Sequence, residues 1–332
     1  MRRKRNPDDL VSTRKSRWYY IDGIDDARLQ AQLRSGPTGD GYYEHMLIED
    51  ASHLLPFGRG LDDGFRAEVT GTDAKRAESL VCDSLPTQYD RTYLADALRE
   101  FMQRTAQLIV GYESAIYEID YLVDPANPTA PPVAFRFEPL QVGSVEHVGR
   151  RILQYVPVSM AEKVRRNGLG YVELERERVV RFDLPKDIER DARRSVRFLA
   201  SASEQHRAEF ALVEQSMRER TDYDASEHHR MSGELLLEAT RPIGWNARGL
   251  YSDHVLDPYS VWRQLQFKRF KIRLRDSILT RLNEALIVVG GRVGFEAQVE
   301  LLDVPTLADI DAAEADLRDG RRPLADLIAV AY

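Results

Sequence analysis

Apolar residues recur at helical spacing in three long stretches of the chain. The first stretch runs from about Arg91 to Val110, and the third begins at Asp257 and runs to about Ile287. An Asp followed by Pro is a strong start signal, because the Asp side chain caps the helix and Pro suits its first position. The first stripe consists of Leu94, Leu98, Phe101, Thr105, Leu108 and Tyr112. Steps of three and four residues place these side chains on one face, so we expect an amphipathic helix here.

The second stretch, 186–220, carries a narrower stripe. Its members follow each other at steps of three and four without a slip: Val196, Leu199, Ser203, His206, Phe210, Val213 and Met217. Two apolar positions per seven residues resemble the seam of a coiled coil. A helix of this length spans about 50 Å. We expect it to pack against one or two other helices as an oligomerisation element. The alternative is a solvent-bridging helix within one subunit.

Between these helices the period changes from three or four residues to two. Val133–Leu184 alternates apolar and polar residues, and Asn167-Gly168 is typical of a tight hairpin turn, so we predict a small antiparallel β unit. A short helix is expected near Ser159–Arg166. The Pro-rich run 124–132 cannot be helical, because proline removes backbone donors and restricts its neighbours. Residues Ser114–Val123 before it are compatible with a strand or with a longer helix.

The remaining segments have weaker patterns. The stretch 221–256 is polar and rich in Gly and Pro, so we expect it to be irregular. Val288–Leu302 alternates again and predicts a strand. Thr306 with Asp309 resembles a capping box for a final acidic helix, which Gly320 and Pro323 end. These elements together predict an α+β fold.

Charge is distributed unevenly along the 332 residues, although the net charge is only −7. Residues 1–17 hold seven Arg/Lys against two Asp and are expected to be a disordered basic arm, and 259–284 hold seven cations against two acids. The segment 303–326 holds seven Asp/Glu. An acidic chain is a poor candidate for tight, indiscriminate DNA binding, because phosphate neutralisation dominates that affinity. Local basic strips can still contact nucleic acid or an acidic partner.

No apolar run is long enough to cross a membrane, and no apolar segment follows the basic N-terminus as in a signal peptide. Cys82 is the single cysteine, which excludes an intramolecular disulfide and a zinc site built on several cysteines. His228 and His229 are adjacent, and adjacent residues of a helix point about 100° apart, so we expect no metal site. The Gly-rich loops 36–41 and 57–64 lack the Gly-Lys-Ser/Thr ending of a phosphate-binding loop. We therefore expect neither a cofactor nor enzymatic activity.

The order of helix, Pro-rich break, β unit, long helix, irregular loop, second long helix, strand and acidic helix resembles the portal proteins of tailed bacteriophages and related gene-transfer particles. The sequence echo is clearest at Leu108–Ile119, where an apolar helix reaches a Gly and then an aromatic-Glu-hydrophobic stretch. It continues at Phe137–Leu140, Ile152–Pro157 and Val179–Phe182. The similarity spans roughly Tyr93–Leu302, and the order of the motifs carries it more than any one of them.

The resemblance implies a domain layout with long stem helices on either side of a β-rich clip. It assigns 1–17 to the basic arm, 18–90 to an N-terminal wing, 91–124 to the first stem helix, 125–185 to the clip, 186–220 to the second stem helix, 221–257 to a tunnel loop, 258–302 to a wing helix and strand, and 303–332 to a short acidic helical crown. The chain departs from the family in its short length and thin N-terminal wing.

The resemblance further implies a homo-oligomeric ring, usually of twelve subunits, at one capsid vertex of a virion assembled in a bacterial cytoplasm. Double-stranded DNA passes through such a ring, and the major capsid protein, the terminase motor and a tail adaptor are its expected partners. The residues expected to face DNA are His228, His229, Arg230 and Arg248, with Lys268, Arg269 and Lys271 as weaker candidates. The expected oligomerisation seam is Val196, Leu199, His206, Phe210, Val213 and Met217. The alternatives are another particle adaptor or helical scaffold protein and, less favoured, an enzyme of unrecognised class.

Overall fold

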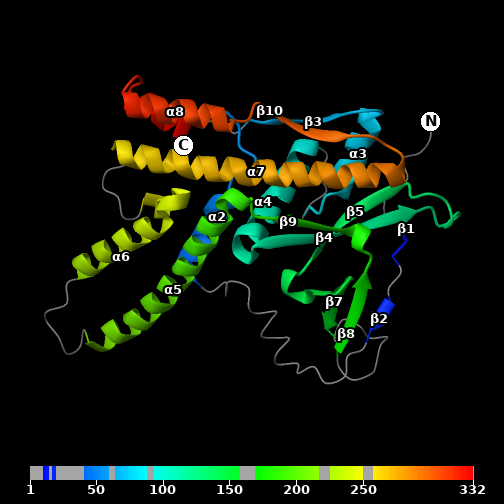
Figure 1. The fold of residues 1–332 in the computed structure, drawn as a ribbon, viewed down its shortest axis with the longest axis horizontal. Coiled ribbons are helices and arrows are strands. Elements are labelled where there is room, and N and C mark those ends of the chain that lie inside the picture. Colours follow the sequence, from blue (N-terminus) through cyan, green and yellow to red (C-terminus); the bar gives the residue numbers. More distant parts are fainter. Residues whose placement is uncertain are drawn as a thin grey trace.

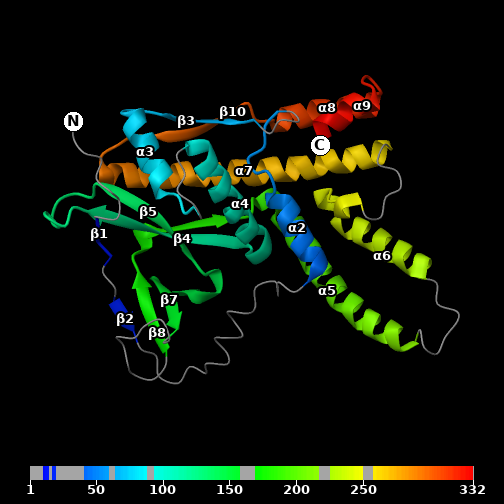
Figure 2. The same ribbon diagram turned by 180° about the vertical axis from the view of Figure 1, so that it is seen from behind.

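A long helix, α7 (Pro258–Val293), forms the spine of this α+β fold in the computed structural model. Figures 1 and 2 show α8 and a two-stranded ribbon along one side of α7, and a sheet with helix α4 along the other. Two protrusions leave this body: a pair of helices, α5 and α6, and a second small sheet. The structure describes residues 10–14, 17–19, 41–59, 64–87, 93–157, 169–216, 225–249 and 257–331.

The first sheet, called sheet A here, is centred on strand β4. Strand β4 (Ser114–Val123) pairs antiparallel with each of the other three strands: β1 (Val11–Ser12), β5 (Ala134–Leu140) and β9 (Val179–Asp183). Helix α4 (Leu94–Tyr112) covers one face, where the Thr105 and Tyr117 hydroxyls are 2.8 Å apart. The segment 114–123 is therefore a strand, and the assignment of all of 91–124 to a stem helix is wrong. Glu113, at φ 66°, ends α4 and turns the chain into β4.

The Pro-rich run 124–132 is the loop of a hairpin that joins β4 to β5, with Leu122 paired to Ala134. It is therefore no boundary between two units, contrary to the domain prediction. The predicted basic arm is likewise partly structured, because β1 extends the edge of sheet A. Strand pairing with a partner more than a hundred residues away satisfies backbone groups there, and no local pattern in the sequence signals it.

The second sheet, sheet B, holds the rest of the predicted β unit. Its strands pair antiparallel in the order β2 (Arg17–Tyr19), β8 (Leu169–Leu174), β7 (Arg151–Pro157) and β6 (Val145–Val148). A small apolar cluster joins the two sheets, with Ile116 and Leu140 from sheet A against Ile152 and Leu174 from sheet B. The antiparallel prediction is confirmed, but the segment 125–185 is divided between two sheets. The predicted turn at Asn167-Gly168 and the predicted helix near 159–166 lie outside the described residues.

Helices α5 (Lys186–Ser216) and α6 (Ala225–Thr240) form the helical protrusion. The prediction that 221–256 is irregular is wrong for 225–240. Gly233 suggested a break, but it is buried within α6 together with Leu236 and Thr240. The residues that follow, Glu234–Ala239, are strong helix formers, and they outweigh the low helix propensity of one glycine. Short 3₁₀ turns follow at Arg241–Ile243 and Ala247–Gly249.

Helix α7 continues six residues beyond the predicted end at Ile287. The buried side chains in this part follow helical spacing of three and four residues: Leu286, Val289 and Val293. The prediction of a strand from Val288, which relied on alternation, is therefore wrong as far as Val293. Gly294, at φ 82°, ends the helix. The strand that follows, β10 (Gln298–Leu302), pairs antiparallel with β3 (Arg66–Thr70). Both predicted caps are confirmed, with Asp257 accepting from the Ser260 amide at 2.7 Å and a capping box at Thr306.

The remaining helices complete one large apolar core. They are α2 (Tyr42–Ser52), α3 (Ala74–Ser84), α8 (Leu307–Asp319) and α9 (Leu324–Ala331). Helices α8 and α9 pack on α7 through Ile310, Ala313 and Leu327, which are all buried. The acidic C-terminal segment is thus helical, as predicted, and joins the main core. Among the described residues no helix combines the length and apolar character needed to cross a bilayer.

Two adjacent glycines of α7 provide a test of this packing. A Cβ added at Gly290 would lie 2.2 Å from the backbone oxygen of Phe295, whereas one at Gly291 would meet nothing within 4 Å. We expect Gly290→Ala to lower the free energy of unfolding by about 1–3 kcal/mol, because backbone cannot yield as a side chain does. Gly291→Ala, the matched control, should raise it by about 0.5–1 kcal/mol through helix propensity. Urea denaturation of both variants measures the difference, and equal effects would contradict the packing of Phe295 on α7.

Candidate functional site

Arg248, one of the residues predicted to face DNA, lies in an ion-pair cluster within the chain. Its guanidinium bonds the Asp50 carboxylate through Nε and the Glu49 carboxylate through Nη2, both at 2.8 Å. The Arg248 hydrogen bond lowers the pKa of Glu49. Trp245 donates to the same Asp50 at 2.8 Å. These contacts connect the turn after α6 to helix α2, so the charge of Arg248 is engaged in ion pairs within the chain.

The three cations predicted on α7 are also engaged within the chain. Arg269 is 17% exposed and pairs with Asp311 at 2.5 Å and Glu314 at 2.7 Å on α8. Lys268 donates to the backbone oxygen of Val330 at 2.6 Å, and Lys271 donates to that of His53 at 2.7 Å. The side-chain nitrogens of both lysines also lie over the Phe57 ring, at 5.4 and 5.3 Å. These contacts hold α8, α9 and the segment after α2 on the spine, and the role of the three cations in contacting DNA stays a prediction.

The other predicted DNA contacts lie on the helical protrusion. His228, His229 and Arg230 belong to the described backbone of α6, which replaces the irregular loop predicted there. Their side chains lie outside the described part of the structure. Their role in contacting DNA stays a prediction.

The predicted oligomerisation seam begins inside the chain's own core. Val196 is 8% exposed and Leu199 is fully buried, and α5 packs there against α2 and α6. The seam prediction is therefore wrong for these two residues, because a face already covered by its own chain is not available to another subunit. His206, Phe210 and Val213 continue the same stripe along α5, but their side chains lie outside the described residues, as does the whole of Met217.

The opposite face of α5 carries a basic stripe that the sequence interpretation missed. Five cations line a shallow groove of about 570 Å³ together with Glu189: Lys186, Arg190, Arg193, Arg194 and Arg197. Arg193 and Arg197 both contact the Glu113 carboxylate, at 3.1 and 3.2 Å. The signal was present in the sequence as i, i+4 spacing at 186, 190 and 194.

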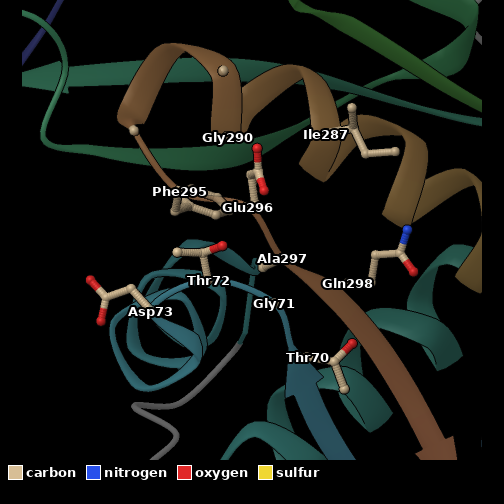
Figure 3. A pocket seen from close by; sticks show the side chains of 12 residues that line it. Thr70, Gly71, Thr72, Asp73, Ile287, Gly290, Phe295, Glu296, Ala297 and Gln298 are labelled. Atoms are coloured by element: carbon tan, nitrogen blue, oxygen red, sulfur yellow. The ribbon is translucent and has the colours of Figure 1, made fainter.

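A second groove, of about 840 Å³, lies between the end of α7 and the turn from β3 to α3 (Figure 3). Gly71 allows the turn to approach this end of α7, since a Cβ there would lie 2.2 Å from the backbone oxygen of Glu296. The ionisable side chains in the lining are Asp73 and Glu296, so the lining holds neither a cation nor a histidine or cysteine. We interpret the groove as a result of glycine packing.

Two carboxylates are buried on β4, where the N-terminal segment crosses it. Glu118 is 3% exposed and pairs with Arg14 at 2.7 Å, while Asp120 is 9% exposed and accepts from the Ser12 hydroxyl at 2.7 Å. Burial raises the pKa of Glu118, Arg14 and Arg178 oppose this rise, and Asp120 adds to it. A raised pKa beside a cleft would suggest catalysis, but these residues line neither groove. Their contacts fasten the segment 10–14 to sheet A.

The raised pKa of Glu118 predicts how stability changes with pH. The Glu118 carboxyl holds its proton more tightly in the folded state than in the unfolded state. The contribution of Glu118 to the free energy of unfolding therefore falls as pH rises from the ordinary carboxyl pKa through the raised value. Glu118→Gln removes that dependence, and the variant should gain stability relative to the parent as pH rises across this window. Urea denaturation at several pH values measures it. Arg14→Met removes the cation that opposes this rise, so the stability of that variant should fall more with pH than the stability of the parent does. A stability difference that is constant with pH would contradict the assignment to Glu118.

No group of three or more potential metal ligands occurs among the described residues. No protein-family model matches the sequence, and the search of curated proteins finds no match. The helical protrusion with its basic stripe is the candidate site.

Proposed function

We propose that this chain is the subunit of a ring-shaped portal, the conduit through which double-stranded DNA enters and leaves a virus-like particle at one capsid vertex. The observation that carries the proposal is the helical protrusion. Helix α5 spans about 46 Å at 1.5 Å per residue and leaves the body together with α6 (Figure 1). In the part of α5 whose side chains the structure describes, 186–202, one face is buried in the chain and the other is charged. Such hairpins, standing side by side, suit the wall of a channel.

The other parts of the fold support the same proposal. Sheet B projects from the body and joins sheet A through a small apolar cluster, which suits a module that contacts a packaging motor and later a tail adaptor. The body around α7 suits contact with the capsid protein. Repeated head-to-tail contacts between identical subunits close into a ring when the rotation allows it, and twelve is the number we propose. We propose a structural role without catalysis, with the particle assembled in a bacterial cytoplasm.

The net charge of −7 supports a conduit over a tight DNA-binding protein. A channel must attract DNA without holding it, and each phosphate that a protein neutralises adds affinity that falls steeply with salt. The cations of α7 and the turn after α6 are engaged within the chain. A channel whose wall makes only a few, separated basic contacts with DNA therefore suits a duplex that slides through it.

Light scattering of the purified chain tests the proposal. A portal should have a mass near twelve times 38.0 kDa, and negative-stain images should show a ring with a central channel. A stable monomer would overturn the proposal. A large assembly without a channel would instead favour an adaptor or a helical scaffold protein.

A further inference from the structure

The two helices of the protrusion expose faces of opposite charge. On α5 the exposed face holds Arg190, Arg194 and Arg197, with the Phe198 side chain 37% exposed beside them. On α6 it holds Glu234 and Glu238 with the Leu235 side chain between them, 60% exposed. The exposed Arg241 in the turn after α6 lies 3.9 Å from Glu238, so the α6 face holds two carboxylates and one cation. Each face thus carries an excess of one charge together with one large apolar side chain.

These two faces point away from each other. The buried stripe of α5 includes Ser195, whose hydroxyl donates to the backbone oxygen of Ala239 on α6 at 3.1 Å. On α6 the buried side is formed by Gly233, Leu236 and Thr240. In a helix the exposed and buried stripes lie on opposite sides of the axis. The basic face of α5 and the acidic face of α6 are therefore on opposite sides of one hairpin.

We propose that the basic face of α5 binds the acidic face of α6 on a second copy of this chain. One subunit then offers a basic side to one neighbour and an acidic side to the other, which is a head-to-tail contact that closes into a ring. Phe198 and Leu235 lie near the centre of this contact and the charged side chains surround them, as in the apolar core and polar rim of protein interfaces. The inference rests on the proposed ring and names its contact surfaces.

On α5, contacts within the chain leave positive charge for this partner. The five cations of the α5 groove meet three carboxylates of their own chain, Glu113, Glu189 and Asp191, at 2.6–3.3 Å. The side chain of Arg190 is 92% exposed. On α6, Arg241 reaches Glu238 only at 3.9 Å, the outer limit of an ion pair. The α5 face therefore keeps an excess of positive charge and attracts an acidic surface.

DNA is the other partner that a basic stripe could attract, and two observations favour a second copy. Glu189 and Asp191 stand among the cations and would repel phosphates. The exposed rings and methyl groups of Phe198 and Leu235 gain nothing from a phosphate backbone, which dominates binding to duplex DNA. An interface between subunits needs such apolar side chains.

Charge reversal on each face tests the contact. Arg190→Glu/Arg194→Glu makes both faces acidic, and Glu234→Arg/Glu238→Arg makes both basic. Each variant alone should need at least tenfold more protein for half assembly than the parent. A 1:1 mixture of the two variants should recover the parent's assembly, because opposite faces meet again. Lys75→Glu/Arg318→Glu changes the net charge as much as the first variant at exposed positions elsewhere, and should assemble like the parent.

The outcomes separate this contact from the ring itself. Circular dichroism and thermal melting first establish that each variant is folded. If the parent forms a ring and both variants form it equally well, the contact is wrong while the ring stands. If the parent is a monomer, both proposals fail. A mixture that does not recover assembly also overturns the contact. So does a first variant that assembles normally but no longer retains a 30-bp DNA duplex in low salt, since the stripe would then be a DNA surface.

Discussion

Replacing Phe101 with alanine should lower the free energy of unfolding by about 3–5 kcal/mol, the range for a large aromatic residue lost from a core. Phe101 is fully buried on α4. Its ring centroid lies 5.4 Å from that of Tyr117, 6.1 Å from that of Phe137 and 5.7 Å from that of Phe182. These three residues belong to β4, β5 and β9. One side chain therefore holds a helix against every long strand of sheet A.

Urea denaturation followed by circular dichroism measures this loss. Tyr112→Ala is the matched control, because Tyr112 is an aromatic residue on the same helix whose side chain is 44% exposed. Its replacement should change stability by about 0.5 kcal/mol or less. Comparable losses in the two variants would show that α4 does not cover sheet A through this aromatic cluster.

Replacing Arg263 with alanine should cost about 2–5 kcal/mol, because each buried acceptor left without a donor costs roughly 1–3 kcal/mol. Arg263 is 2% exposed on α7. It donates to the backbone oxygen of Leu237 at 2.8 Å and to the Thr240 hydroxyl at 3.1 Å, and it also bonds the backbone oxygen of Trp245. The last carbonyls of a helix have no partner within it, so Arg263 supplies donors at the C-terminal end of α6.

The loss should be local as well as global. Hydrogen exchange in Arg263→Ala should accelerate in α6 more than in α4, since the arginine connects the helical protrusion to the spine. Arg263→Lys should recover only part of the stability, because an ammonium cannot reproduce the planar fork of a guanidinium. Arg273→Ala, the control on the same helix, removes a half-exposed pair with Asp187 and should cost at most about 1 kcal/mol. Equal exchange in α6 of the two alanine variants would contradict the role of Arg263.

Several elements could be predicted from local sequence because their signals are local. The Asp257-Pro258 start and the capping box at Thr306 depend on side chains within a few residues, and both are present. The apolar stripe of α4 places Leu94, Leu98 and Phe101 in the core as its period predicts. Alternation likewise gave the antiparallel strands, although it did not show which strands become neighbours.

The candidate site was harder to predict, because charge in a sequence does not reveal its partners. Arg248 and Arg269 were basic residues in suitable segments, and only the fold brings Glu49 and Glu314 against them. The reverse holds for Arg190 and Arg194, which remain exposed because the opposite side of α5 is buried. Exposure and pairing depend on residues distant in the sequence, and they decide which cations can meet another molecule.

The sequence by itself determined the α+β class, the long helices, their caps and the antiparallel character of the strands, because each follows from periodicity or from neighbouring residues. Only the tertiary structure decided that β4 pairs across the Pro-rich loop, because the residues of a strand do not specify its neighbour, and it also showed that 225–240 is helical. It also decided that Val196 and Leu199 are covered by their own chain. A stripe along a helix shows that a face will be buried, but only the packing shows what buries it.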